Sequence, residues 1–438
     1  MRIGIFPELN RLSGGVFQYG LTMLHALRGL KSSDDEYVIF AHEGFDGEAF
    51  ASLEAGAAWR VESVVPPSLR RQTFFVLSRA LGETRSREAV QWLRGQMQRA
   101  SSRGKATIDP DVVRRCPEVA RWLRRCGVEL MLYPAANPLS FETGMPSVVA
   151  VHDLQHRLQP EFPEVSADGV WEQREYLYRN LARHATLLLT DSETGREDVL
   201  NFYAEYGATP ERVKVLPFLP AHYLTSDIAE DERQRVRATH HLPERYLFYP
   251  AQFWPHKNHA RLVRALGLLK QQGINVSIVL VGSHAGEIRE ATFQDVESLA
   301  HEQGVAEHVH YLGYVPDEDM SALYAEAVAL VMPTFFGPTN IPVLEAWAFD
   351  CPVLTSDIRG IREQAGDAAL LVNPRSVEEL AEGIRRLWTD ENLRQTLTAQ
   401  GRRRLATYSY RDYCRRLGEI IEEAKALVHL EERRSTAS

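Results

Sequence analysis

The sequence predicts an α/β protein made of two domains, each built on a mostly parallel sheet. Short apolar runs bounded by turn residues recur along the chain, and such runs are typical of buried parallel strands. Helical segments separate these runs, as they do in α/β domains. A polar stretch that begins with two prolines, residues 217–243, divides the pattern into two series. Because a domain usually has about 100–200 residues, a chain of 438 residues suits this division.

The first series predicts an N-terminal domain over residues 1–220. It opens with a strand (2–6), a loop (7–15) and a helix (16–30). Apolar runs predict further strands at 37–41, 130–133, 147–151, 186–189 and 213–216. Helical patterns are expected over 173–182 and 196–206.

The second series predicts a C-terminal domain over residues 244–407, after a linker at 221–243. Its expected strands are 246–249, 276–281, 309–312, 329–332, 352–355 and 369–372. Its expected helices are 260–272, 293–303, 317–326, 342–349 and 377–390. Two long charged helices follow at 391–407 and 411–432, and residues 433–438 are expected to fray.

Composition and charge exclude several classes of protein. With 44% hydrophobic and 25% charged residues, the chain is neither mostly disordered nor fibrous. A net charge of −9 argues against a nucleic-acid partner. Four cysteines without a CxxC pair favour neither a disulfide scaffold nor structural zinc, so we expect a reducing cytoplasm. The apolar run at the N-terminus is too short for a signal peptide and lacks its cleavage site, so none is expected. No apolar run reaches the ~18–20 residues of a spanning helix, which leaves peripheral membrane contact open.

A basic segment interrupts the first series over about 66–126. Between positions 70 and 125 it carries fourteen lysines and arginines against five acidic residues, with aromatic and aliphatic residues between them. Such a segment can form a surface that meets anionic lipid or a phosphorylated acceptor. It can equally be a solvated helical insertion without a partner.

Two α/β domains joined by a linker predict a cleft, and small-molecule sites favour the carboxyl ends of parallel strands. Gly14 and Gly15 lie in a loop between the first strand and the first helix. Glycines there let backbone N–H groups approach an anion at the helix start. The spacing is not GxGxxG, so it does not favour a dinucleotide, and a plain tight turn is the alternative.

Two further candidates follow strands. Lys257, in the segment 249–258, can reach a diphosphate as a point charge, although most lysines near turns are simply exposed. His152 ends a strand of the first domain, where it can bond a sugar hydroxyl or a phosphate. The His152–His156 spacing does not favour a metal, because a strand precedes it and the HExxH glutamate is absent. Nor does the His256–His259 pair, which lacks a completing carboxylate or cysteine.

The loop 333–341 leads into a helix with Pro342 in its first turn. The N–H groups of Asn340 and Ile341 are placed to hold phosphate oxygens. Glu345, one turn in, can accept hydrogen bonds from two ribose hydroxyls. The plainer interpretation is an acidic residue that favours a helix start.

Together these segments resemble the GT-B retaining glycosyltransferases that use nucleotide sugars, called family 4 or group 1. In the second domain the resemblance rests on the Lys257 segment and on 281–283, 311–316, 342–346, 356–363 and 371–374. In the first domain it rests more weakly on Gly14–Gly15, His152–Asp153, 191–193 and 213–217.

The resemblance implies two Rossmann-like domains that face a central cleft, with 408–438 crossing back to the first domain. It implies a catalytic set of His152, Lys257 and Asn340. Lys257 would bind the donor diphosphate, Glu345 the ribose, and His152 the transferred sugar. The remaining donor-binding residues would be Gly14, Gly15, Gln252, Gly282, Tyr314, Val315, Thr339, Asn340 and Ile341. The backbone at 313–315 would lie near the base, and no metal is expected.

Two positions depart from the family pattern. The first glutamate of a pair separated by seven residues falls on Gly337, and its role would pass to Thr339, Asn340, water or nothing. The usual arginine before the lysine is Gln252, so one diphosphate partner is missing or comes from elsewhere. These departures motivate a second hypothesis, a weak or inactive GT-B protein that binds a glycan or a partner.

The resemblance also suggests the substrates. The donor is expected to be a nucleotide sugar, with a GDP-mannose type faintly favoured. The acceptor is expected to be a glycan or a polyprenyl-linked glycan in surface polysaccharide assembly, at the cytoplasmic face of a membrane touched through 70–125. A sugar epimerase or phosphorylase fits less well, and a Rossmann oxidoreductase fits least because GxGxxG is absent.

Overall fold

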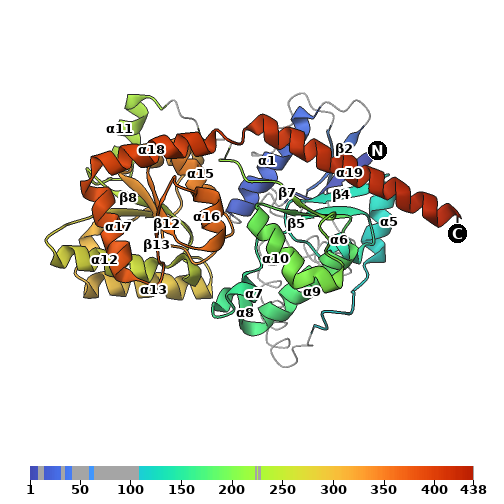
Figure 1. Ribbon diagram of the computed structural model, residues 1–438, viewed down its shortest axis with the longest axis horizontal. Coiled ribbons are helices and arrows are strands. Elements are labelled where there is room, and N and C mark those ends of the chain that lie inside the picture. Colours follow the sequence, from blue (N-terminus) through green and yellow to red (C-terminus); the bar gives the residue numbers. More distant parts are fainter. Residues whose placement is uncertain are drawn as a thin grey trace, which may run out of the picture.

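A computed structural model describes residues 1–7, 14–30, 35–41, 59–63, 108–221, 224 and 228–437. The chain forms two α/β domains that lie side by side (Figure 1). Each domain has one parallel sheet with helices on both of its faces, as the sequence predicts. The loop predicted over 7–15 and the basic insertion predicted over 66–126 lie partly outside the described residues. The described part of that insertion contains the helix α5 (Pro117–Arg125).

The N-terminal sheet has seven parallel strands in the order β3-β2-β1-β4-β5-β6-β7. Their bounds are β1 (Arg2–Ile5), β2 (Glu36–Ala41), β3 (Trp59–Ser63), β4 (Leu130–Tyr133), β5 (Ser147–Ala150), β6 (Leu187–Thr190) and β7 (Val213–Val215). Sequence analysis missed β3, because an edge strand that alternates polar and apolar residues has no continuous apolar run.

Successive side chains of these strands supply two separate cores, as the two-residue period of a strand requires. In β4, Leu130 and Leu132 pack with α1 (Gly15–Gly29) on one face, whereas Met131 and Tyr133 pack with α5 and α9 (Val170–His184) on the other. The helices of this domain are α1 (Gly15–Gly29), α5, α6 (Leu139–Glu142), α7 (Gln155–Leu158), α8 (Pro163–Ser166), α9 (Val170–His184) and α10 (Glu193–Tyr203).

The C-terminal sheet has six parallel strands in the order β10-β9-β8-β11-β12-β13. Their bounds are β8 (Leu247–Pro250), β9 (Ile278–Val281), β10 (Val309–Tyr311), β11 (Ala329–Met332), β12 (Val353–Ser356) and β13 (Leu370–Val372). The helices are α11 (Glu230–Thr239), α12 (His259–Gln271), α13 (Glu287–Glu302), α14 (Asp317–Glu326), α15 (Ile341–Ala348), α16 (Arg359–Ala365), α17 (Val377–Thr389) and α18 (Glu391–Leu405).

The linker predicted over 221–243 is wrong in part, because this segment contains the helix α11. It packs on α14, and its Val236 is fully buried in the C-terminal core. The sequence of this segment lacks a helical apolar pattern, because Val236 is the only large apolar residue of α11. Tertiary contacts hold the helix: Arg237 donates to Glu326, and His240, just beyond it, bonds Asp319 at 2.6 Å. The link between the domains therefore ends near residue 229.

The last helix, α19 (Tyr410–Ala437), leaves the C-terminal domain and lies across the N-terminal domain, as expected (Figure 1). Its apolar face packs against α1 through Tyr413, Leu417, Ile420, Ile421, Ala424 and Val428. The fraying predicted for 433–438 is wrong as far as Ala437, because the helix continues to that residue. None of the described helices is both long and apolar enough to span a bilayer.

Candidate active site

A cavity of about 480 Å³ lies between the two domains, where the chain leaves strands of both sheets. This size suits a nucleotide-sized ligand. Residues from both domains line it, and they include most of the predicted site. The predicted residues in its wall are Gly14, Gly15, His152, Gln252, Lys257, Thr339, Asn340 and Ile341.

Lys257 ends a short 3₁₀ turn after β8. The next residue, Asn258, has φ 63° and its buried amide donates to the carbonyl oxygens just after β11 and β13, at 2.9 and 2.8 Å. The Lys257 amine makes no hydrogen bond or ion pair with any residue that the structure describes. Burial lowers the pKa of Lys257 to about 8, although Asp153 and Glu164 raise it. This unpaired cation in the cavity wall is available to an anionic ligand.

Gln252 lies on the same wall and connects to an arginine that sequence reasoning missed. Its Oε1 accepts hydrogen bonds from Trp254 Nε1 at 3.0 Å and from Arg289 Nη1 at 2.8 Å. The Arg289 guanidinium also lies over the Trp254 ring, 4.7 Å from its centroid. Gly14 approaches from the other domain, where a Cβ would lie 3.9 Å from Gln252 Nε2. The neutral side chain of Gln252 is therefore hydrogen-bonded to a cation, the guanidinium of Arg289.

In the loop before α15, the role predicted for the Asn340 N–H is wrong. Asn340 does not offer its N–H to a phosphate, because that N–H donates to Gln364 Oε1 at 2.9 Å. Gln364 returns a bond to Asn340 O at 2.8 Å, so α16 holds the loop in place. The Ile341 N–H, at the first position of α15, remains as the backbone donor there. Thr339 donates across the cleft to Asp191, whose pKa burial raises to about 7.

Glu345 is buried within α15 and is not part of the cavity wall. Tyr324 donates a hydrogen bond to it at 2.6 Å, and the backbone N–H of Ala221, between the domains, donates another. Burial raises the pKa of Glu345 to about 7, although both donors lower it. Its carboxylate is thus occupied by the chain segment that joins the two domains.

Three other predicted residues also lie outside the cavity wall. Gly282 has φ 147°, and a Cβ there would lie 2.5 Å from Ala251 O, so close packing of the two turns requires glycine. Its N–H donates to Gly313 O at 3.1 Å. Beyond that turn, Tyr314 is 61% exposed and Val315 is buried. The structure therefore brings these residues to one edge of the sheet without placing them against the ligand space.

His152 is the predicted residue of the opposite wall. It follows β5, and its Nε2 donates to Pro134 O at 2.7 Å. Its ring packs edge-on against Tyr19, with centroids 4.9 Å apart. Burial lowers the pKa of His152, although the Pro134 carbonyl raises it, so the ring is neutral near pH 7. Its Nδ1 is then an acceptor for a hydroxyl.

Sequence reasoning missed Arg174, which lines the cavity beside His152. Arg174 is ion-paired with Asp153 and donates from Nε to His156 Nδ1 at 3.1 Å. Burial raises the pKa of Asp153, but Arg174, the Gln155 N–H and the two neighbouring histidines together outweigh it, so the pKa is lowered. The arginine comes from α9, in the middle of a run of charged residues where nothing in the sequence marks it.

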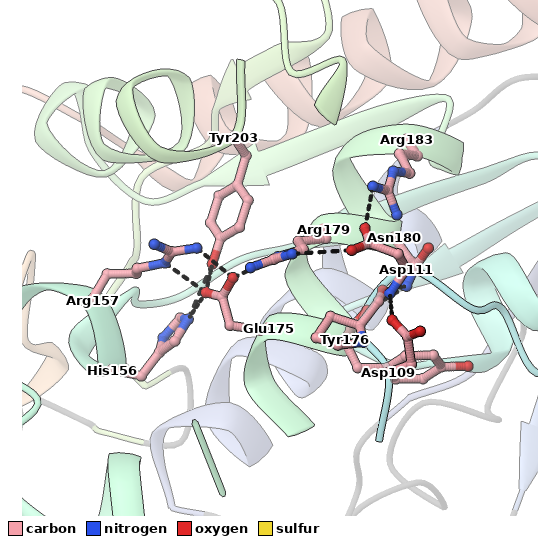
Figure 2. Close-up of polar contacts among 11 residues, drawn as sticks. Asp109, Asp111, His156, Arg157, Glu175, Tyr176, Arg179, Asn180, Arg183 and Tyr203 are labelled. Carbon is pink, nitrogen blue, oxygen red and sulfur yellow. Dashed lines mark hydrogen bonds and ion pairs between the residues drawn. The ribbon is translucent and has the colours of Figure 1, made fainter. Parts of the chain in front are cut away.

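Glu175 is the centre of a hydrogen-bond network that includes His156, and Figure 2 shows the four side chains that bind it. Its fully buried carboxylate accepts hydrogen bonds from His156 Nε2 at 2.9 Å, Arg157 Nε at 2.6 Å, Arg179 Nε at 2.7 Å and Tyr203 OH at 2.9 Å. Although burial opposes it, these donors hold the pKa of Glu175 far below its ordinary value. Because His156 donates to Glu175 and accepts from Arg174, the network fixes the side chain that reaches the cavity.

The two domains touch directly around the cavity. Glu363 on α16 accepts from the N–H groups of Glu193 and Thr194 at the start of α10, at 2.8 and 2.7 Å. Gln155 Nε2 donates to Gly337 O at 2.9 Å. A carboxylate at a helix N-terminus is favourable, so these contacts stabilise the closed arrangement. Among the described residues, no group of three or more His, Cys, Asp or Glu could hold a metal ion.

Comparison with known proteins finds a family model that matches part of the chain and several relatives of modest identity. Residues 230–404 match the family described as "Glycosyl transferases group 1". O-antigen chain mannosyltransferase B of Escherichia coli is 28% identical over 270 residues, 60% of this chain and 67% of that protein. The MMP alpha-(1->4)-mannosyltransferase of Mycolicibacterium hassiacum is 25% identical over 298 residues, 65% of this chain and 67% of that protein.

Solved structures share the whole architecture. Anabaena Alr3699/HepE, in complex with UDP and glucose, aligns with a TM-score of 0.67 at 17% identity and covers 96% of this chain and 99% of its own. WaaG, a glycosyltransferase involved in lipopolysaccharide biosynthesis, aligns with a TM-score of 0.64 at 17% identity and the same coverage. The chain has the GT-B fold, and its C-terminal domain is similar to the group 1 glycosyltransferases.

Proposed function

We propose that this protein is a retaining glycosyltransferase of family 4 that transfers a hexose from a nucleotide sugar to a hydroxyl of a glycan or lipid-linked glycan. The observation that carries the proposal is the unpaired amine of Lys257 in the wall of an interdomain cavity. Burying an unpaired charge costs free energy, and this cost is offset only when an anion binds the lysine. The diphosphate of a nucleotide sugar is such an anion.

In this proposal the donor diphosphate lies between Lys257 and the first turn of α15, where the Ile341 N–H points to the ligand. Gly14 and Gly15 approach the diphosphate from the other domain. The ribose binds Glu345, which requires the Ala221 N–H to leave that carboxylate. Donor binding would therefore be linked to a movement of the segment between the domains.

The transfer step breaks the bond between the anomeric carbon and the diphosphate oxygen. Negative charge grows on the leaving diphosphate, and Lys257 stabilises it, an effect of several kcal/mol in such sites. The acceptor hydroxyl attacks from the same face, its oxygen bonds to the anomeric carbon, and its proton passes to the departing diphosphate oxygen. His152 Nδ1 accepts a hydrogen bond from a hydroxyl of the transferred sugar and so orients the sugar.

Mannose is the first sugar to test. Three relatives bear mannosyltransferase names, among them the serotype-specific mannosyltransferase WbdA of Escherichia coli. This agrees with the faint preference for a GDP-mannose type of donor. UDP-glucose is the second choice, since Alr3699/HepE was also solved with UDP-glucose. The O-antigen name of one relative supports an acceptor in surface polysaccharide assembly.

The first experiment is a thermal-shift panel of GDP, UDP, ADP and dTDP with their common sugar conjugates. A ligand that binds the native state raises its melting temperature by mass action. We expect one nucleotide to give a clear shift that Glu345→Ala removes, and the matching sugar to be transferred to a glycan acceptor. Binding of a nucleotide sugar without any transfer or hydrolysis would instead favour the weak or inactive protein that Gly337 suggests.

We also propose peripheral contact with anionic membranes through the basic segment. In α5, Arg121, Arg124 and Arg125 are exposed, while Val119 and Leu123 are buried in the N-terminal core. The contact would therefore be electrostatic, at about 1 kcal/mol for each arginine near the lipid surface. Sedimentation with phosphatidylglycerol vesicles, but not with phosphatidylcholine vesicles, should pull the protein down at low salt and release it at high salt.

A further inference from the structure

Glu164 is an acidic residue of the N-terminal domain that reaches the C-terminal domain. It lies in α8 and lines the interdomain cavity together with Lys257. Its Oε1 accepts hydrogen bonds from His256, from the backbone N–H at 3.1 Å and from Nδ1 at 2.6 Å. The Glu164 side chain is only 6% exposed. A carboxylate is thus held against the turn that presents the unpaired lysine.

The second carboxylate oxygen of Glu164 has no hydrogen-bond partner. Oε2 is buried and makes no bond with the described residues. A buried carboxylate oxygen without a donor costs free energy, and such a group calls for an explanation. His256 fixes the orientation of the carboxylate and leaves one acceptor for a donor that the chain itself does not supply.

The surroundings of Glu164 indicate what that donor is. His256 O accepts the N–H of Phe335 at 2.8 Å, and the His256 ring stacks on Phe336 with centroids 3.8 Å apart. Glu164 is therefore tied to the loop that continues into Gly337, where the chain has no acidic side chain. That part of the cavity combines a lysine for a diphosphate with an unsatisfied acceptor, a pairing suited to a sugar attached to that diphosphate.

We propose that Glu164 binds a hydroxyl of the donor sugar and so supplies, from the opposite domain, the carboxylate that the loop at position 337 lacks. This assignment rests on the proposed function. Because the acid and the lysine come from different domains, the sugar subsite is complete only when the domains are closed. The nucleotide portion, in contrast, depends mainly on the C-terminal domain. Sugar recognition would thus favour closure before transfer, which keeps water from the reactive donor.

The test compares two ligands on four proteins: the wild type, two variants of Glu164 and one control variant. Isothermal titration measures the Kd of the nucleotide sugar selected by the thermal-shift panel and of the matching free nucleoside diphosphate. Glu164→Gln keeps an oxygen for His256 but replaces the free acceptor by an amide. We expect about a tenfold loss of affinity for the nucleotide sugar, in line with a lost hydrogen bond to a charged group, and less than about a twofold change for the diphosphate.

Glu161→Gln is the matched control. Glu161 is in the same segment and also crosses to the C-terminal domain, where it accepts from Arg375 at 3.0 Å, but it does not line the cavity. We expect both of its affinities to match wild type. Glu164→Ala, checked for an unchanged melting temperature, should repeat the sugar-selective loss.

Three outcomes would overturn the assignment. If Glu164→Gln weakens both ligands by the same factor, Glu164 is only a closure contact. If it weakens neither, Glu164 does not touch the sugar. If the wild-type protein binds no nucleotide sugar, the proposed function fails, and the assignment fails with it. The first two results leave the proposed function standing, so the two failures are distinguishable.

Discussion

The two walls of the cavity differ in how their charges are satisfied. On the C-terminal wall, Lys257 has no partner among the described residues. On the N-terminal wall, Arg174 is ion-paired with Asp153 and donates a hydrogen bond to His156, which in turn donates one to Glu175. The C-terminal wall therefore leaves a positive charge for a ligand. On the N-terminal wall the cation of Arg174 is already neutralised by Asp153, and the group left for a ligand is an acceptor oxygen of Glu164.

This difference teaches which part of a ligand each wall suits. An uncompensated cation favours a diphosphate, since only an anion repays the cost of its burial. A charge-balanced set of donors and acceptors favours neutral hydroxyl groups, which need hydrogen bonds and no net charge. The walls thus divide the proposed donor between them: its diphosphate toward the C-terminal domain, its sugar toward the N-terminal domain.

The largest effect should come from removing the unpaired charge. Lys257→Ala should lower kcat/KM for transfer by about 100-fold or more, because the leaving diphosphate loses its cation. The fold should be unaffected, since the amine makes no contact that the fold needs. Steady-state kinetics and thermal denaturation measure the two quantities. Lys270→Ala is the control: its amine bonds Gly304 O and Glu307 on the surface, and activity should not change. Full activity of Lys257→Ala would contradict the contrast between the walls.

A substitution that breaks the buried network of the N-terminal wall should first of all lower the stability of the protein. Glu175→Gln should lower the free energy of unfolding by about 3 kcal/mol, because the buried His156 and two partly buried arginines lose a charged acceptor. Chemical denaturation measures this loss. Asp111→Asn, at the exposed end of the same network where Arg179 and Arg183 meet it, should cost less than about 1 kcal/mol. Equal effects of the two variants would show that burial does not set the strength of this wall.

The smallest effect concerns pH. Because burial holds the pKa of Lys257 near 8, kcat/KM for the donor should fall above about pH 8, by roughly tenfold at about pH 9. Unfolding does not explain such a loss. The pKa of this lysine is lower in the folded state than in the unfolded state, so between pH 8 and about 10.5 the unfolded state binds more protons and this site makes the fold more stable as pH rises. A profile that stays flat beyond pH 9 would mean that donor use does not depend on the charge of Lys257 in the free protein.

Local signals predicted much of the fold and part of the site. β5 and β11 are continuous apolar runs, which a buried parallel strand requires, and they were predicted within one residue. Lys257 lies in the connection between β8 and α12, and Asn340 directly precedes α15, so the order of elements alone carries both to the cleft. The helix α11 escaped prediction because a single buried valine and ion pairs to α14 hold it, and neither has a local signature.

The sequence by itself determined the two parallel sheets and the segments that line the cavity, because hydrophobic periodicity and strand-end loops are local properties of the chain. The crossing of the last helix followed only from the family resemblance. Only the tertiary structure decided which polar groups are left for a ligand. Gln364 uses the Asn340 N–H, and the segment between the domains uses Glu345, whereas Lys257 and one oxygen of Glu164 have no partner. Hydrogen bonding between residues far apart in sequence settles that distribution, and no spacing within one segment encodes it.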